Sequence, residues 1–480
     1  MVRSSLAQLM HKLIWQGSCQ FPTLGFVVDR YLKVRNFVPE PFWSIKLNYT
    51  RDDIDVSFLW RRNRLFDRAV VTILFERCLD ARLAKVTKVE EKPTKKWKPL
   101  PLTTVELQKM ATRFLRMDGQ RAMSVAENLY QKGFISYPRT ETDRFDPGMN
   151  LRDLCSKQTT DHRWGQFAQN LVNGGFQQPR QGRNDDKAHP PIHPIAWVAP
   201  TALDSEDHRR LYEFVVRRFL ACCSEDAQGR ATDVEVEYGS ETFHAHGLVV
   251  VARNYLDVYP YENWHSSQPM PLFQLGEKFE PMKAMMTEGK TTAPGYLTEP
   301  DLLALMDANG IGTDATMADH IGMIKKRDYV IVRPRGGGAT NNNQTTRGGR
   351  GGNRGGRGSR GGRGGSRGGG DNDAAPRGNA MEEFIPTTLG IALVEGYDNV
   401  GLETSLSKPF LRKEMEASMK DICEGRKTKQ DVVRTSLNRY KQVYLKTEEE
   451  FNVLKAVSFA GFLLVMALVL PTVSRMSQTD

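Results

Sequence analysis

The spacing of apolar residues changes along the chain between a helical period and a strand-like alternation. In residues 122–133 (AMSVAENLYQKG) four apolar side chains fall on one helical face, and they belong to Met123, Ala126, Leu129 and Tyr130. Gly133 then supplies a left-handed stop. The helical spacing extends back to Thr103, which begins a TTVE capping box. These patterns predict a helical region around residues 103–133.

Helical spacing returns in three later parts of the chain. Residues 211–223 (LYEFVVRRFLACC) predict one helix, and residues 298–310 (TEPDLLALMDANG) predict another that is capped by Thr298. Residues 310–332 predict a tight turn, a second helix and a strand, an arrangement like a helix-turn-helix. Residues 382–397 resume the globular pattern and lead into a long charged helix, which we expect to end near residue 455.

Alternation of apolar and polar residues marks two other regions. Residues 46 to about 90 alternate like strands around the turn sequence TRDD, and residues 231–251 (ATDVEVEYGSETFHAHGLVVV) predict a hairpin of long strands. The lysine-rich residues 88–101 (KVEEKPTKKWKPLP) are predicted to be a linker. Because the alternating regions lie on both sides of the helical region, we expect one β domain that is interrupted by an α domain.

Length and composition indicate a mixed, multidomain protein. The chain has 480 residues, of which 39% are hydrophobic, so two to four compact units with real cores are expected. The six cysteines show no CxxC spacing, which favours a reducing compartment and argues against a zinc site. We therefore predict no structural metal. The first residues lack the apolar segment and cleavage site of a secretory signal peptide.

Positive charge is concentrated in one low-complexity insert. Between Arg335 and Gly378 the chain holds nine arginines and two aspartates, a charge of +7 out of the net +10. Too few apolar residues are present there to offset chain entropy, so we predict disorder for residues 335–380. Arg-Gly repeats of this kind bind nucleic acid, and a solvated spacer is the alternative.

The apolar residues 456–474 (AVSFAGFLLVMALVLPTVS) have a length at the short end of the range that spans a bilayer. A tail anchor, a packed C-terminal segment and a gene-model artefact are three interpretations of them. We expect no association with a membrane.

The segment GFISYPRTETDRF (133–145) contains the residues best suited to chemistry. Pro138 disfavours the α region at Tyr137, so we expect an extended or turn conformation there, with the phenol directed by a stiff backbone. A phenol oxygen can attack a phosphodiester, and a guanidinium two residues further on, at Arg139, can donate paired hydrogen bonds to the phosphate. A half-buried core tyrosine is the alternative.

Two further segments were considered for chemistry. Residues 185–195 (DDKAHPPIHPI) gather two carboxylates, a lysine and two histidines in a loop stiffened by proline. Such ordered polar loops favour a functional site, and a surface loop with exposed histidines is the alternative. Residues 287–292 (TEGKTT) end like a P-loop, but Ala284 occupies the position of its first glycine. ATP hydrolysis is therefore not predicted.

Several long motifs in one order resemble the type IA DNA topoisomerases, and specifically eukaryotic topoisomerase III. The resemblance covers about residues 15 to 450 apart from the insert, and it rests on SCQFPTLGFVVDRY, FVPEPFW, GFISYPRTETDRF, DDKAHPPIHP, NYLDVYPYENW, LMDANGIGTDATMADHI and LVEGYD. The activity it implies is ATP-independent cleavage and rejoining of one DNA strand, with strand passage, in recombination, repair and replication.

The resemblance also implies roles for individual residues. Tyr137 matches the nucleophile that holds the 5′ phosphate. Arg139 matches a residue that orients this tyrosine and stabilises the scissile phosphate, and His189 matches a histidine near that phosphate. Lys187 matches a residue that lies against the DNA backbone. Residues 312–316 match a groove that binds single-stranded DNA, with contacts from Thr313, Asp314 and Thr316.

The fold implied by the resemblance is mixed α and β and multidomain. It is a toroid in which a β-rich gate or arch, split by the helical tyrosine domain, closes on a helical base. The expected domains are the helical base in residues 1–45, 293–334 and 381–455, the gate in 46–97 and 199–292, the tyrosine domain in 98–198, the Arg-Gly insert in 335–380 and the apolar tail in 456–480.

The family uses Mg²⁺ held by acidic residues of a domain that precedes this region, and no matching acidic cluster is found in this chain. Cysteine-rich zinc modules of the family are also absent, so we expect a shortened chain.

Single-stranded DNA is the expected ligand, a RecQ-type helicase and a small OB-fold protein are the implied partners, and the nucleus is the implied location. A non-catalytic single-strand-binding scaffold and an RNA-preferring topoisomerase stay open as alternatives.

Overall fold

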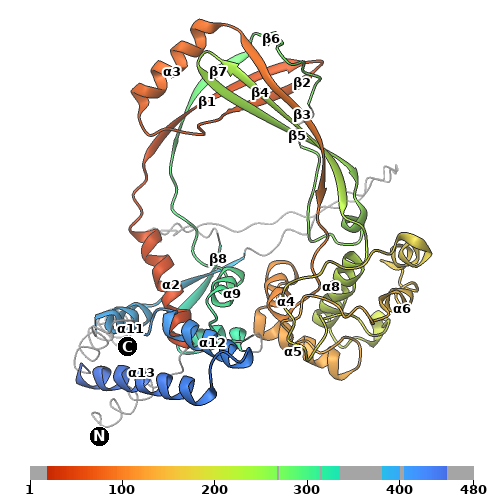
Figure 1. Cartoon of the computed structure of the whole chain (residues 1–480), viewed down its shortest axis with the longest axis vertical. Coiled ribbons are helices and arrows are strands. Elements are labelled where there is room, and N and C mark those ends of the chain that lie inside the picture. Colours follow the sequence, from red (N-terminus) through yellow and green to blue (C-terminus); the bar gives the residue numbers. More distant parts are fainter. Residues whose placement is uncertain (1–18, 268–269, 314–315, 336–380, 400–404, 451–480) are drawn as a thin grey trace, which may run out of the picture.

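The computed structural model describes residues 19–267, 270–313, 316–335, 381–399 and 405–450. In Figure 1 the chain closes into a ring, in which an arch made mainly of strands stands on two separate helical parts. The predicted disorder of the Arg-Gly insert and the predictions for residues 456–480 lie outside the described residues, apart from Arg335. Within them, no helix is long and apolar enough to cross a membrane.

The arch is an antiparallel sheet of seven strands in the order β6-β3-β4-β5-β2-β1-β7. Strands from both sides of the helical region pair with each other, which confirms the prediction of one interrupted β domain. The strands are β1 (Pro41–Arg51), β2 (Ile54–Trp60), β3 (Ala84–Lys96), β4 (Ala227–Tyr238), β5 (Glu241–Ala252), β6 (Lys278–Phe279) and β7 (Lys283–Lys290).

The sheet buries one face against its own helix. Helix α3 (Arg68–Ala81) was not predicted, and its buried residues Val71 and Cys78 join a core formed by apolar residues of the strands, among them Ile45, Phe58 and Phe243. Asp67 caps the helix, because its carboxylate accepts a hydrogen bond from the Val70 amide at 3.2 Å.

The prediction of a linker at residues 88–101 is wrong for most of that segment. Strand β3 runs to Lys96 and pairs with β4 along its whole length, and even Pro93 lies opposite Arg230. The segment shows no alternation of apolar and polar residues, because most of its side chains are exposed on both faces of the strand pair and none of these faces needs to be apolar. The hydrogen bonds to β4, which is distant in sequence, therefore determine that this segment forms a strand.

The helical part that contains Tyr137 has its own apolar core. Its helices are α4 (Thr104–Met110), α5 (Gly119–Gln131), α6 (Leu151–Ser156), α7 (Gly165–Asn170) and α8 (Glu206–Cys222), and π-helical turns follow α4 and α7 at Ala111–Leu115 and Leu171–Gly175. The caps predicted for this region are present, because Thr103 caps α4 and Gly133 has a φ of +75° after α5.

The boundary predicted at residue 198 lies too early. The apolar face of α8, with Leu211, Phe214 and Val215, belongs to the core of the tyrosine domain, as do Tyr255 and Tyr259 near the 3₁₀ turn Asn254–Asp257. Helix α8 contacts α5, and none of its described residues belongs to the apolar core of the sheet. Strand β4 therefore begins in the tyrosine domain and β5 ends there. Only the parts of these two strands that lie farther from the tyrosine domain belong to the arch.

The second helical part is the base of the ring, and its helix α2 leads up to the arch (Figure 1). It comprises α2 (Gln20–Arg35), α9 (Glu299–Ala308), α10 (Met317–Lys326), α11 (Thr388–Asn399) and the hairpin of β8 (Val330–Pro334) and β9 (Glu382–Pro386). The predicted cap is confirmed, because Thr298 and Asp301 form a capping box at the start of α9. The apolar core gathers residues from all these elements, including Leu24, Leu303 and Phe384.

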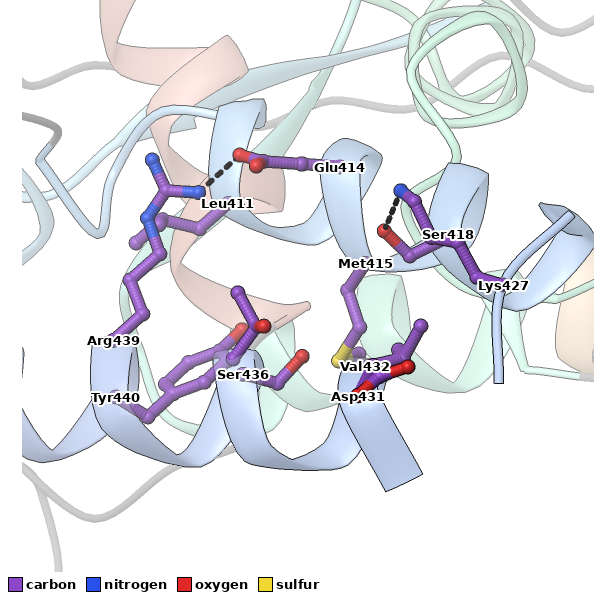
Figure 2. Close-up of a pocket in the computed structure, with 11 residues that line it drawn as sticks. Leu411, Glu414, Met415, Ser418, Lys427, Asp431, Val432, Ser436, Arg439 and Tyr440 are labelled. Atoms are coloured by element: carbon purple, nitrogen blue, oxygen red, sulfur yellow. Dashed lines mark hydrogen bonds and ion pairs between the residues drawn. The ribbon is translucent and has the colours of Figure 1, made fainter. Parts of the chain in front are cut away.

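The predicted long charged helix towards residue 455 is present as α13 (Lys429–Glu449), and a second helix, α12 (Phe410–Cys423), precedes it across a turn. Figure 2 shows a cleft between these helices, in which Arg439 pairs with Glu414 and Lys427 donates to Ser418. None of the residues that line this cleft comes from the tyrosine segment or the loop at 185–190.

The tyrosine domain and the base meet at the first turn of α5. The buried Glu299 of α9 accepts a hydrogen bond from the Gly119 amide at 2.7 Å and one from Lys325 Nζ at 3.2 Å. Beside it, Gln120 Nε2 donates to Asp319 at 3.1 Å. A Cβ atom on Gly119 would lie 3.0 Å from the Glu299 carboxylate, so a glycine allows this close approach.

Candidate active site

The segment that carries Tyr137 is fixed by a short pairing with residues 192–194. Ile135 bridges Pro194, the Ser136 amide donates to the His193 carbonyl at 2.9 Å, and the His193 amide donates to Ser136 Oγ at 3.0 Å. Ile135 is fully buried, and Tyr137 two residues later is partly exposed. This pairing therefore holds Tyr137 at the surface of the domain.

Two rings pack against the Tyr137 phenol. The His189 ring lies 4.6 Å from it between centroids, and the Tyr130 ring meets it edge-on at 5.2 Å. His189 comes from the loop at 185–190 and Tyr130 from the last turn of α5. Two residues that the sequence analysis named separately, Tyr137 and His189, are therefore in contact.

Arg139 is held by an acidic residue of α5. Its Nε donates to Glu127 Oε1 at 2.7 Å, and its Nη2 donates to the same oxygen. Both side chains are only partly exposed, at 28% for Arg139 and 37% for Glu127. This ion pair therefore fixes one edge of the guanidinium.

Asp186 organises the loop that presents His189. Its Oδ1 accepts hydrogen bonds from the amides of Ala188 and His189, at 2.9 and 2.8 Å, and its Oδ2 accepts one from Thr140 Oγ1 at 3.0 Å. Although partial burial opposes ionisation, these hydrogen bonds lower the pKa of Asp186 to about 2. The carboxylate thus ties the loop to Thr140, three residues after Tyr137.

Lys187 lies in the same loop with a left-handed backbone, at a φ of +57°. Its amide donates to Asp185 Oδ1 at 2.9 Å, and Asp185 also forms an ion pair with Arg144. Tyr137 and His189 are therefore in contact, while Arg139 follows Tyr137 by two residues and Lys187 precedes His189 by two residues in the loop. Thr313 and Thr316 lie instead just before α10 in the base, with the Thr313 amide donating to Thr316 Oγ1 at 3.0 Å, and Asp314 lies outside the described residues.

A partly exposed tyrosine packed on a histidine, beside an arginine and a lysine, can bring a phenol to a phosphodiester. Comparison with known proteins agrees with this chemistry: the sequence profile of a family described as DNA topoisomerase matches residues 2–342. The chain belongs to that family. Its assignment to the type IA topoisomerases, of the topoisomerase III kind, is confirmed.

Named members of the family are similar to this chain over most of its length. DNA topoisomerase 3 of Schizosaccharomyces pombe is 43% identical over 454 residues, which cover 95% of this chain and 66% of the relative. Human DNA topoisomerase 3-alpha is 44% identical over 438 residues, 91% of this chain and 39% of the relative. This chain thus spans two thirds or less of these relatives.

A solved structure of full-length topoisomerase I from Thermotoga maritima has a similar fold. Its TM-score is 0.62 at 20% identity, and the match covers 90% of this chain and 63% of that one. The expected type IA toroid, with a β-rich arch on helical parts, is confirmed.

Sequence reasoning about this topoisomerase missed Glu127, Asp186 and Tyr130 as neighbours of the site. Glu127 lies twelve positions before Arg139, and only the turn after α5 brings the two together. Asp186 was visible only as one of two carboxylates in the loop. A helical face predicted Tyr130, but nothing in the sequence placed its ring against Tyr137.

The magnesium site that the topoisomerase family implies does not fit the residues at hand. Among the residues that the structure describes, no group of three or more His, Cys, Asp or Glu side chains could hold a metal ion. Asp186 is committed to two amides and a threonine hydroxyl.

Proposed function

We propose that this chain carries the strand-cleaving half of an ATP-independent DNA topoisomerase. The observation that carries the proposal is the contact of Tyr137 with His189, beside the Arg139–Glu127 pair, on one rigid surface. The relatives named DNA topoisomerase 3 support DNA as the substrate. Tyr137 attacks the phosphate of a single strand and holds its 5′ end in a phosphotyrosine link.

The bond changes in this step balance without an energy source. The phenol oxygen forms a bond to phosphorus, the bond from phosphorus to the 3′ oxygen breaks, and the phenolic proton leaves as the 3′ oxygen gains one. Arg139, His189 and Lys187 surround this centre with donors that stabilise charge on the phosphate. Because one phosphodiester replaces another, the reverse attack by the 3′ hydroxyl rejoins the strand without ATP.

A labelled-adduct assay tests the proposal. The chain is incubated with a single-stranded DNA labelled at its 3′ end and is then denatured, so that a 5′-linked adduct carries the label. Tyr137→Phe should abolish the adduct while single-strand binding stays nearly unchanged, since only one hydroxyl is lost. Tyr444→Phe, in a partly exposed tyrosine of α13, is the matched control and should retain the adduct.

The same assay separates the alternatives. A label that persists with Tyr137→Phe would identify another nucleophile. Binding without an adduct in any substrate would favour the non-catalytic scaffold, and an adduct formed only with RNA would favour the RNA-preferring enzyme.

The partners and location are further parts of the proposal. We infer a nuclear location from the DNA-directed names of the relatives, and a RecQ-type helicase and a small OB-fold protein as partners from the family resemblance. Affinity capture of the tagged chain from a nuclear fraction tests both. Recovery of neither partner class would remove that part of the proposal, and exclusion of the chain from nuclei would remove the location.

A further inference from the structure

A buried threonine holds the backbone on both sides of Arg139. Thr104, the first residue of helix α4, is fully buried, and its Oγ1 donates to the Pro138 carbonyl at 2.7 Å. The same oxygen accepts the Thr140 amide at 2.7 Å, and the Thr104 amide donates to the Thr140 carbonyl at 3.1 Å. One residue therefore binds the neighbours of Arg139 on either side, and the first of these neighbours directly follows Tyr137.

The backbone just before Thr104 contacts the other half of the site. Leu102 forms a bridge with Ile192, and the Ile192 amide donates to the Leu102 carbonyl at 2.8 Å. Ile192 lies three residues after His189. Residues 102–104 therefore contact both the segment that carries the tyrosine and the loop that carries the histidine.

The Thr104 hydroxyl binds the tyrosine segment and is not part of the cap of α4. Thr103 caps this helix by accepting the Glu106 amide at 3.4 Å, and Leu107 anchors the helix in the apolar core. A valine in place of Thr104 would have a similar shape, but it would leave the buried Thr140 amide without this acceptor. The contacts of the hydroxyl thus indicate a role in the site.

We propose that Thr104 is a positioning residue for strand cleavage, because it sets where Arg139 lies beside Tyr137. The inference rests on the proposed function and adds a residue to it. Glu127 fixes the guanidinium of Arg139, and Thr104 fixes its backbone, so this donor is held at both ends. Since a displacement of about 1 Å at a reacting centre slows a reaction strongly, a hydroxyl buried beneath the site contributes to the rate.

Two substitutions separate the hydroxyl from the shape of the side chain. Thr104→Val should slow adduct formation at saturating DNA about ten- to hundredfold, while the affinity for single-stranded DNA stays within about twofold. Thr104→Ser keeps the hydroxyl and should retain most of the parent rate. Thr112→Val is the matched control and should react like the parent, because that hydroxyl donates to the Gln108 carbonyl one helical turn earlier at 3.0 Å. Adduct formation at the parent rate in Thr104→Val, or equal slowing in Thr104→Ser, would overturn the proposal.

A double substitution distinguishes positioning from a general loss of stability. In an Arg139→Ala background, Thr104→Val should slow adduct formation by less than about a further threefold, because the group that Thr104 positions is already absent. A general effect on the fold would instead slow both backgrounds by the same factor, and that result would count against the proposal.

Hydrogen exchange tests the same contact without any cleavage. In peptides that contain residues 138–141, the Thr140 amide should exchange about tenfold faster in Thr104→Val than in the parent or in Thr104→Ser, because it loses its acceptor. Unchanged exchange would overturn the inference. If the parent formed no adduct with any DNA, the proposed function would fail, whereas faster exchange in Thr104→Val would still support the hold of Thr104 on the backbone beside Arg139.

Discussion

Replacing Glu299 with alanine should loosen the contact between the tyrosine domain and the base. In the structure, one oxygen of this carboxylate accepts the Gly119 amide at 2.7 Å and the other accepts Lys325 Nζ at 3.2 Å. Only 8% of the Glu299 side chain is exposed. The amide is the first of helix α5, so the carboxylate also faces the positive end of the helix.

The size of the effect follows from these two contacts. A hydrogen bond to a charged, buried acceptor contributes about 1.5–3 kcal/mol. The ion pair adds less than about 1 kcal/mol, because 26% of the Lys325 side chain is exposed to solvent. A total of about 2–3 kcal/mol would make local opening about 30 to 150 times more frequent.

Hydrogen exchange measured by mass spectrometry reads this opening directly. Peptides that contain the first-turn amides of α5, residues 119–122, should exchange faster by about that factor in Glu299→Ala, while the apolar core of each domain stays protected. Glu299→Gln keeps an acceptor for Gly119 but loses the charge, so its exchange should be intermediate. Glu395→Ala, an exposed glutamate of α11, is the control. Unchanged exchange at residues 119–122 in Glu299→Ala would refute the reasoning.

Three other predictions follow from the described contacts. Glu127→Ala should slow adduct formation about five- to thirtyfold by releasing Arg139, and it should have no further effect when Arg139→Ala is already present, because both changes act on one guanidinium. Gly25→Ala should destabilise the base by about 1–3 kcal/mol in denaturant unfolding, because its Cβ would lie 2.0 Å from the Ser407 carbonyl oxygen. Burial lowers the pKa of His193 below its ordinary value of 6.5, so below that pH the unfolded chain binds more protons at this residue than the folded chain does. The melting temperature should therefore fall as the pH drops below about 6.5, and it should fall less in His193→Gln.

Each of these predictions has a matched control and a contradicting result. Gln131→Ala, at the exposed end of α5, should leave adduct formation unchanged, and additive losses in Glu127→Ala with Arg139→Ala would mean that Glu127 acts elsewhere. Gly148→Ala meets only the Asp146 side chain, at 3.1 Å, and should cost less than Gly25→Ala. A pH profile of melting that is identical in His193→Gln would assign the pH dependence to other groups.

The sequence by itself determined most local elements and singled out Tyr137 as the candidate nucleophile. Helices such as α5 and α9 were predictable because their apolar faces and their caps, Thr298 and Gly133 among them, act within a few residues. The interrupted β domain was also predictable, since its alternation was clear on both sides of the helical region.

Only the tertiary structure decided where distant segments meet. Strand β3 has no apolar alternation and exists through its pairing with β4, more than a hundred positions later. In the same way, Glu127 reaches Arg139, Asp186 binds Thr140, and His189 packs on Tyr137 because of turns and loops that no local pattern encodes. Periodicity reports which face of an element is buried, whereas contacts between elements depend on the packing of the whole chain, and the site is built from such contacts.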